Sequence, residues 1–103
     1  MFTENMTTLT QVKEVQPQWF SKENKRFFND VSYRVMIGKQ SHSPYLVRYT
    51  AAWSDMFGQP KRFHYCINHL DPETLKIGHL IEKDNMTIQF MDIDAVKDWL
   101  REN

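Results

Sequence analysis

Three side chains that often take part in catalysis or metal binding lie close together in this 103-residue chain: His64, Cys66 and His69. A structural zinc site needs four ligands, and the chain has one cysteine and no CxxC or HxxxH pair, although His42 or His79 would supply a further imidazole. A nucleophilic Cys66–His64 pair is a weak candidate, because side chains two positions apart on a strand point the same way without reliably forming a hydrogen bond. We therefore predict no metal site and no catalytic residue.

Motifs of the common enzyme classes are also missing from the sequence. There is no GxGxxG, P-loop, GxSxG or HExxH motif. The glycines, Gly38, Gly58 and Gly78, are too far apart to form a loop that holds a phosphate. We expect a protein that is not an enzyme and binds no cofactor, and we interpret Cys66 as a small side chain that fills space.

The stretch AAWSDMFGQPKRFHY, residues 51–65, combines a predicted turn with large apolar side chains. Turns usually lie in water and consist of small polar residues, yet Met56 and Phe57 lie at this bend and Lys61 and Arg62 follow it. Either these apolar side chains fold back onto the protein's own core, or they contact a partner. Aromatic and basic side chains together are typical of protein-binding hot spots, so we predict that these four residues bind a partner protein.

The elements that position these residues are three predicted β-strands. Residues 31–37 (VSYRVMI), 45–53 (YLVRYTAAW) and 62–68 (RFHYCIN) each alternate apolar and polar side chains. Consecutive strands with short connections form an antiparallel meander. Residues 86–91 (MTIQFM) are a candidate fourth strand, so we expect a sheet of three or four strands.

The alternation predicts one apolar and one polar face for this sheet. Tyr33, Tyr49 and Tyr65 fall on the apolar face, which removes them from contact with single-stranded nucleic acid, whose bases stack on exposed aromatic rings. The polar face is either solvated, with its arginines paired to the acidic C-terminal part, or binds an anion such as phosphate or an acidic protein surface. Its predicted residues are Ser32, Arg34, Arg48, Thr50, Arg62, His64 and Cys66, with Met36 and Leu46.

Two short helices are predicted to flank the sheet. Ser21 can cap a helix over residues 22–28, and Asp92 or Asp94 can cap an amphipathic helix that ends at Arg101. An amphipathic helix this short is stable only when it docks, and the apolar sheet face is the expected docking surface. The predicted class is therefore α+β, with residues 1–16 as a flexible leader and residues 17–103 as a single domain.

Composition narrows the expected setting and partners. The formal net charge is zero, with 13 basic and 13 acidic residues, so the chain has no overall attraction to nucleic acid or to anionic membranes. Basic residues are in excess over residues 17–69 and acidic ones over residues 70–103. A single cysteine suits a reducing compartment, and no signal peptide or membrane-spanning stretch is present. We expect a cytoplasmic protein with no membrane association.

Three stretches of the chain, KRFFNDVSYRV, PYLVRYTAAWSDMFG and KRFHYCIN, resemble small uncharacterised proteins encoded by bacteriophages and prophages. The resemblance spans about residues 22–68. It supplies no catalytic residues, but it implies a role, because small phage accessory proteins often bind and block host proteins, including restriction and CRISPR machinery.

Two functions follow as hypotheses. The first is a non-enzymatic protein-binding module that inhibits a host or defence protein through Met56, Phe57, Lys61 and Arg62 and through the polar sheet face. The alternative is nucleic-acid or nucleoprotein binding through that basic face. An unpaired edge strand is compatible with a monomer or a dimer. The predicted partner-binding residues of the polar face are Arg34, Arg48 and His64.

Overall fold

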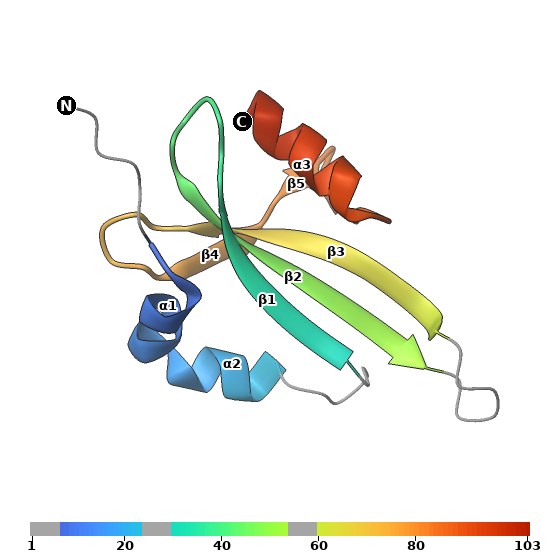
Figure 1. Ribbon diagram of the computed structural model, residues 1–103, viewed down its shortest axis with the longest axis horizontal. Coiled ribbons are helices and arrows are strands. Elements are labelled where there is room, and N and C mark those ends of the chain that lie inside the picture. Colours follow the sequence, from blue (N-terminus) through green and yellow to red (C-terminus); the bar gives the residue numbers. More distant parts are fainter. Residues whose placement is uncertain (1–6, 24–29, 54–59) are drawn as a thin grey trace.

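The computed structural model describes residues 7–23, 30–53 and 60–103, with the backbone alone at residues 21–23, 30, 52–53 and 60–63. Its fold is α+β, and helices lie on both sides of an antiparallel sheet (Figure 1). The elements, in chain order, are α1 (Leu9–Val15), α2 (Pro17–Glu23), β1 (Asp30–Ile37), β2 (Pro44–Trp53), β3 (Pro60–Leu70), β4 (Ile77–Leu80), β5 (Glu82–Lys83), β6 (Met86–Thr87) and α3 (Ile93–Glu102).

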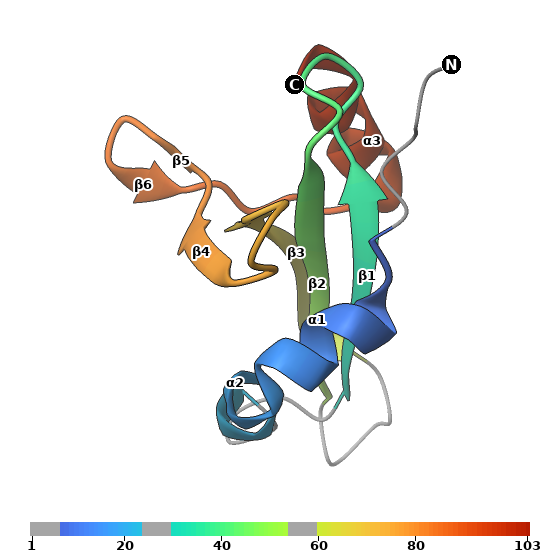
Figure 2. The same cartoon turned by 90° about the vertical axis from the view of Figure 1, so that its left-hand side faces the viewer.

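The main sheet is the predicted meander, with the strand order β1-β2-β3-β4 and every neighbouring pair antiparallel. The fourth strand is β4, whereas the predicted strand over residues 86–91 contributes to the main sheet only a bridge between Phe90 and Tyr65. β5 and β6 form a separate hairpin that projects from the sheet (Figure 2). Its turn residues Asp84 and Asn85 have φ angles of 55° and 65°, as expected for a two-residue turn of type I′.

The register of β1 differs from the one that the apolar alternation predicts. Tyr33 of β1 lies opposite Arg48 of β2, whereas Tyr49 of β2 lies opposite Tyr65 of β3. Opposite residues of an antiparallel pair share a face. The β1–β2 loop, residues 38–43, has an even number of residues between the paired Ile37 and Pro44, so odd-numbered residues of β1 face the same way as even-numbered residues of β2.

The sheet therefore has two apolar faces, each with its own helices, and the prediction of one apolar and one polar face is wrong. On one side, which we call the α3 face, Tyr45, Val47 and Ile67 pack with Val96 and Leu100 of α3. On the other, which we call the α1–α2 face, Leu46 and Leu70 form a second core with Val12 of α1 and Phe20 of α2, joined by the partly buried Tyr33 and Val35.

Helices α1 and α2 correct two predictions about the N-terminal region. Residues 9–15, predicted to be part of a flexible leader, form α1, because Thr8 and Gln11 form a capping box and Val12 is fully buried. The predicted helix over residues 22–28 begins earlier: α2 starts at Pro17, since proline is favoured in the first helical position. Residues 24–28 of that prediction lie outside the described residues.

The C-terminal helix confirms its prediction. Asp92 caps α3 by accepting a hydrogen bond from the Ala95 N–H at 2.8 Å, and Val96 and Leu100 are buried against the sheet. At its other end, the β1–β2 loop caps the helix: the Lys39 N–H donates to the Leu100 carbonyl oxygen at 2.9 Å. In the described part of the chain, no helix is long and apolar enough to cross a membrane.

Candidate functional site

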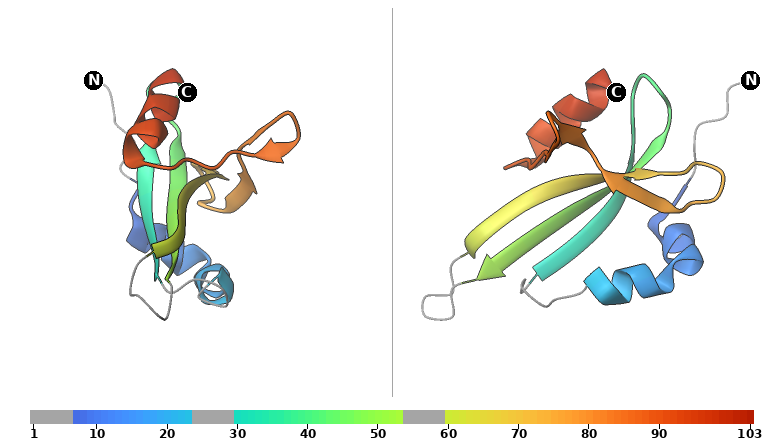
Figure 3. Two further views of the ribbon diagram at one scale, coloured as in Figure 1. Left: turned by 90° about the vertical axis from the view of Figure 1, so that its right-hand side faces the viewer. Right: turned by 180° about the vertical axis from the view of Figure 1, so that it is seen from behind.

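Helix α3 covers only one end of the α3 face. A helix of ten residues is about 15 Å long, whereas a strand of eleven residues, such as β3, is about 36 Å long. Because α3 is held at the β1–β2 loop, the opposite ends of β2 and β3 extend beyond it (Figure 3). The side chains described at this end of the α3 face are Ser32, Arg34, Tyr49, Tyr65 and the fully buried Ala51. We call the first four the tyrosine–arginine surface.

The tyrosine–arginine surface is ordered by cross-strand pairing. Ser32, Tyr49 and Tyr65 form one row across β1, β2 and β3, and Arg34 begins the next row opposite Val47. The two tyrosine rings lie 4.9 Å apart between centroids at an interplanar angle of 44°. The Tyr65 backbone is fixed from the other side by Phe90, whose N–H donates to the Tyr65 carbonyl oxygen at 2.9 Å. This surface is a rigid platform, because strands hold all of its side chains.

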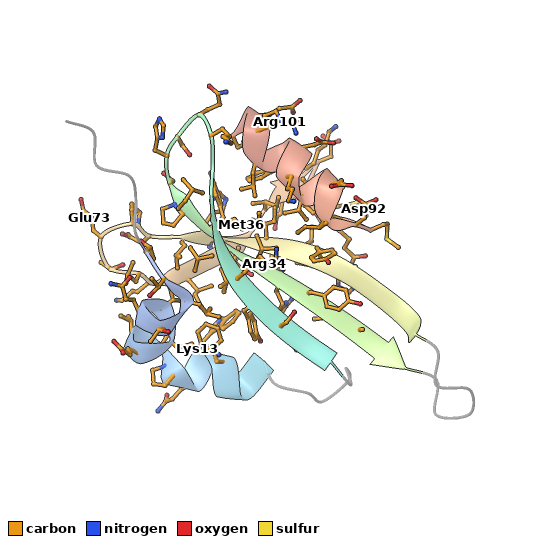
Figure 4. All side chains as sticks on the ribbon, viewed as in Figure 1. Lys13, Arg34, Met36, Glu73, Asp92 and Arg101 are labelled. Atoms are coloured by element: carbon orange, nitrogen blue, oxygen red, sulfur yellow. The ribbon has the colours of Figure 1, made fainter. Side chains whose placement is uncertain are left out.

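Exposure differs across the tyrosine–arginine surface. Ser32 and Arg34 are exposed, and both tyrosines are half-buried. In the described part of the chain, Arg34 forms no ion pair. Figure 4 shows Arg34 on β1, with Met36 two residues further along the strand towards α3. A cavity of about 50 Å³ is lined by Ser32, Tyr33, Arg34, Val47, Tyr49 and Tyr65.

The structure separates the residues predicted to form one basic face. Arg48 and His64 lie on the α1–α2 face, because they are opposite Cys66 and Thr50, whereas Arg34 lies on the α3 face. The predicted cluster of Arg34, Arg48 and His64 is therefore wrong, and the even-length β1–β2 loop is the reason. Of the predicted loop residues, Met56 and Phe57 lie outside the described residues, and Lys61 and Arg62 are described only by their backbone in β3.

The polar residues of the α1–α2 face form a largely buried cluster. Thr50 and Cys66 are buried, and the Thr50 hydroxyl lies 3.2 Å from Nε2 of His64. Burial raises the pKa of the Cys66 thiol, and the charge of Arg48 and its hydrogen bond offset part of that rise. A buried thiol with a raised pKa is a poor nucleophile, since the thiolate is the reactive form.

We expect Cys66 to react with iodoacetamide at pH 8 at least roughly tenfold more slowly in the folded protein than in concentrated urea. The raised pKa lowers the thiolate fraction at this pH, and burial restricts access of the reagent. Mass spectrometry of the alkylated chain measures the rate, and every adduct reports on Cys66 because it is the single cysteine. Equal rates in the two conditions would contradict the burial of this thiol.

Metal ligands are not clustered in the described ranges. Within residues 7–23, 30–53 and 60–103, no three His, Cys, Asp or Glu side chains lie close enough together to hold a metal ion. His69 and His79 do line one shallow depression with Leu80 and Glu82. This depression lies at the β3–β4 edge, away from the tyrosine–arginine surface.

The prediction that Tyr49 and Tyr65 lie on the face that a helix covers is correct, and Tyr65 packs against the core there. Their partial exposure, which makes them candidate contact residues, was not predicted. The signal that was available is length: a ten-residue helix is too short for the strands on which it packs. Comparison with known proteins adds no further residues, since the chain matches no protein-family model and no curated protein or solved structure is significantly similar to it.

Proposed function

We propose that this chain is a non-enzymatic protein-binding module whose interface is the tyrosine–arginine surface. The observation that carries the proposal is the exposed Arg34, without an ion pair in the described part of the chain, beside the half-buried Tyr49 and Tyr65. Tyrosine and arginine are enriched at the centres of protein interfaces, where each side chain contributes a large contact area and a polar group. The rigid strands beneath them reduce the entropy lost on binding.

The predicted loop interface is compatible with this location. Residues 54–59 connect the end of β2 at Trp53 to the start of β3 at Pro60, which are the strand ends that extend beyond α3. Met56, Phe57, Lys61 and Arg62 therefore lie between Tyr49 and Tyr65 along the chain, and we propose that they extend the interface. The resemblance to phage-encoded proteins supports a host or defence protein as the partner, with inhibition as the outcome of binding.

We expect the variant Arg34→Ala/Tyr49→Ala to lose the partner that the wild-type protein captures from a host lysate. Hot-spot side chains contribute about 2 kcal/mol or more each, which corresponds to a loss of roughly 30-fold in affinity. Quantitative mass spectrometry of the captured proteins measures the difference. The matched control is Lys97→Ala, an exposed residue on the outer side of α3, which should capture the same proteins as the wild type. Identical capture by the double variant would contradict the proposed interface.

Single-stranded nucleic acid is the second candidate ligand, and the specific observation in its favour is that the half-buried Tyr49 and Tyr65 keep part of their surface exposed beside Arg34. Bases stack on aromatic side chains of open sheet faces, and a nearby arginine can contact a phosphate. The formal net charge of zero opposes this function, since nucleic-acid binding depends on several phosphate contacts. Titration with oligo-dT at rising salt separates the two candidates: affinity that falls steeply with salt and disappears in Arg34→Ala would favour nucleic acid.

A further inference from the structure

Strand β1 forms one edge of the main sheet. Its eight residues, Asp30–Ile37, pair with β2 and with no other strand in the described part of the chain. The backbone groups on the outer side of an edge strand can pair with an extended segment of another chain. Ser32 and Arg34 of the tyrosine–arginine surface both belong to β1, so this edge and that surface are continuous.

The side chains of β1 define what an added strand would meet. On the α3 face they are Ser32, Arg34 and Met36, of which Met36 packs against the core under α3. On the α1–α2 face they are Val31, Tyr33, Val35 and Ile37, all of which are partly buried. An added strand would therefore favour apolar residues on the α1–α2 side, and on the other side a carboxylate beside Arg34.

We propose that β1 binds an extended acidic segment of the partner protein as a fifth strand of the sheet, with a carboxylate of that segment paired to Arg34. This inference rests on the proposed protein-binding function and names the chemistry of the partner. The guanidinium group of Arg34 forms no ion pair in the described ranges, which leaves it available for a bidentate contact with a carboxylate. The cavity beside Arg34, with Ser32 and Tyr49 among its lining residues, adds hydroxyl groups within the same surface.

The same observations disfavour the other occupants. Two copies of β1 paired antiparallel in the register centred on Arg34 would bring their Arg34 side chains together, and like charges on neighbouring strands repel. Among the described side chains of the tyrosine–arginine surface, Arg34 is the one cation that could contact a nucleic-acid phosphate. A peptide could pair with Arg34 and also with the backbone of the β1 edge. Charge and backbone together favour an acidic peptide.

The test is a selection from a yeast-displayed library of random 12-residue peptides, with the wild-type protein, Arg34→Glu and Lys97→Glu as baits. We expect the wild type and Lys97→Glu to enrich the same peptides, which alternate apolar residues with at least one Asp or Glu. Synthetic versions of these peptides should bind Arg34→Glu about tenfold more weakly by fluorescence anisotropy. Exchanging the acidic residue for lysine should restore binding to Arg34→Glu, and methylation of alternate peptide backbone nitrogens should abolish binding to the wild type.

Other results would overturn this inference. Strand addition at Arg34 would be excluded by any one of three results. The selected peptides lack acidic residues, the wild type enriches no peptide over the Arg34→Glu bait, or backbone methylation leaves the affinity unchanged. Arg34-dependent binding of oligo-dT would assign the surface to nucleic acid, and a dimer in light scattering that becomes monomeric in Arg34→Glu would assign the edge to a second copy. If the peptides fail while lysate capture still depends on Arg34 and Tyr49, the binding mode is wrong and the proposed function stands; if both fail, both are wrong.

Discussion

Replacing Leu46 by alanine is expected to lower the free energy of unfolding by about 2–5 kcal/mol. Leu46 is fully buried on the α1–α2 face, where it packs in one cluster with Val12, Phe20 and Leu70. The shorter side chain removes apolar contacts to both the helices and the sheet, and rigid strands limit how far the surroundings can close the resulting cavity. Urea denaturation followed by circular dichroism measures the change.

The matched control for this prediction is Met86→Ala. Met86 is 72% exposed in the β5–β6 hairpin, so its removal should change stability by less than about 0.5 kcal/mol. The pair of variants also tests the register. Apolar alternation alone places Leu46 on a solvent-exposed face, where truncation would resemble the control. A loss below about 0.5 kcal/mol at Leu46 would therefore contradict the two-sided core.

The strands and the C-terminal helix could be predicted because their patterns are strong and local. Alternation over several residues identifies β1, β2 and β3, and an Asp cap followed by an apolar stripe identifies α3. The register could not be predicted in the same way, because both faces of β2 carry apolar residues, such as Leu46 and Val47. Which of them meets Tyr33 depends on the length of the β1–β2 loop, and a change of one residue moves every side chain to the other face.

Helix α1 shows a second limit of sequence patterns. It has seven residues, too few to be stable alone, and a single buried side chain, Val12, faces the core. Its stability comes from docking and from the Thr8–Gln11 capping box, neither of which gives a periodic signal. A contact from outside the helix adds to this, since the side-chain oxygen of Gln16 accepts a hydrogen bond from the Ile77 N–H of β4.

The candidate site was predicted in part. Arg34 was chosen for its charge, and that choice needs only the sequence. Its neighbours depend on the register, which replaces Arg48 and His64 by Tyr49 and Tyr65. Tyr49 and Tyr65 do lie on the α3 face, where the sequence placed them, and Tyr65 packs against the core there, but both remain partly exposed. Chemistry can therefore be read from single residues, whereas the composition of a surface depends on the pairing of strands.

Gly38→Ala is the second change with a large expected effect, a loss of about 1–3 kcal/mol in the free energy of unfolding. Gly38 is buried where the β1–β2 loop meets the end of α3. An added Cβ would lie 2.9 Å from Cε2 of Tyr45 and 3.0 Å from the backbone carbonyl carbon and oxygen of Asn103. The backbone atoms cannot rotate away as a flexible side chain can, so the loop and α3 must separate.

That separation weakens the hydrogen bonds by which the loop caps α3, from the Lys39 N–H to Leu100 and from the Ser41 N–H to Asn103, each 2.9 Å long. The matched control is Gly78→Ala, whose Cβ would meet the Cβ of His69 at 3.3 Å and should change stability by less than about 1 kcal/mol. Thermal unfolding measures both variants. A marked loss of stability in Gly38→Ala would show that the β1–β2 loop fixes α3 in place over the α3 face. Equal effects of the two substitutions would show that it does not.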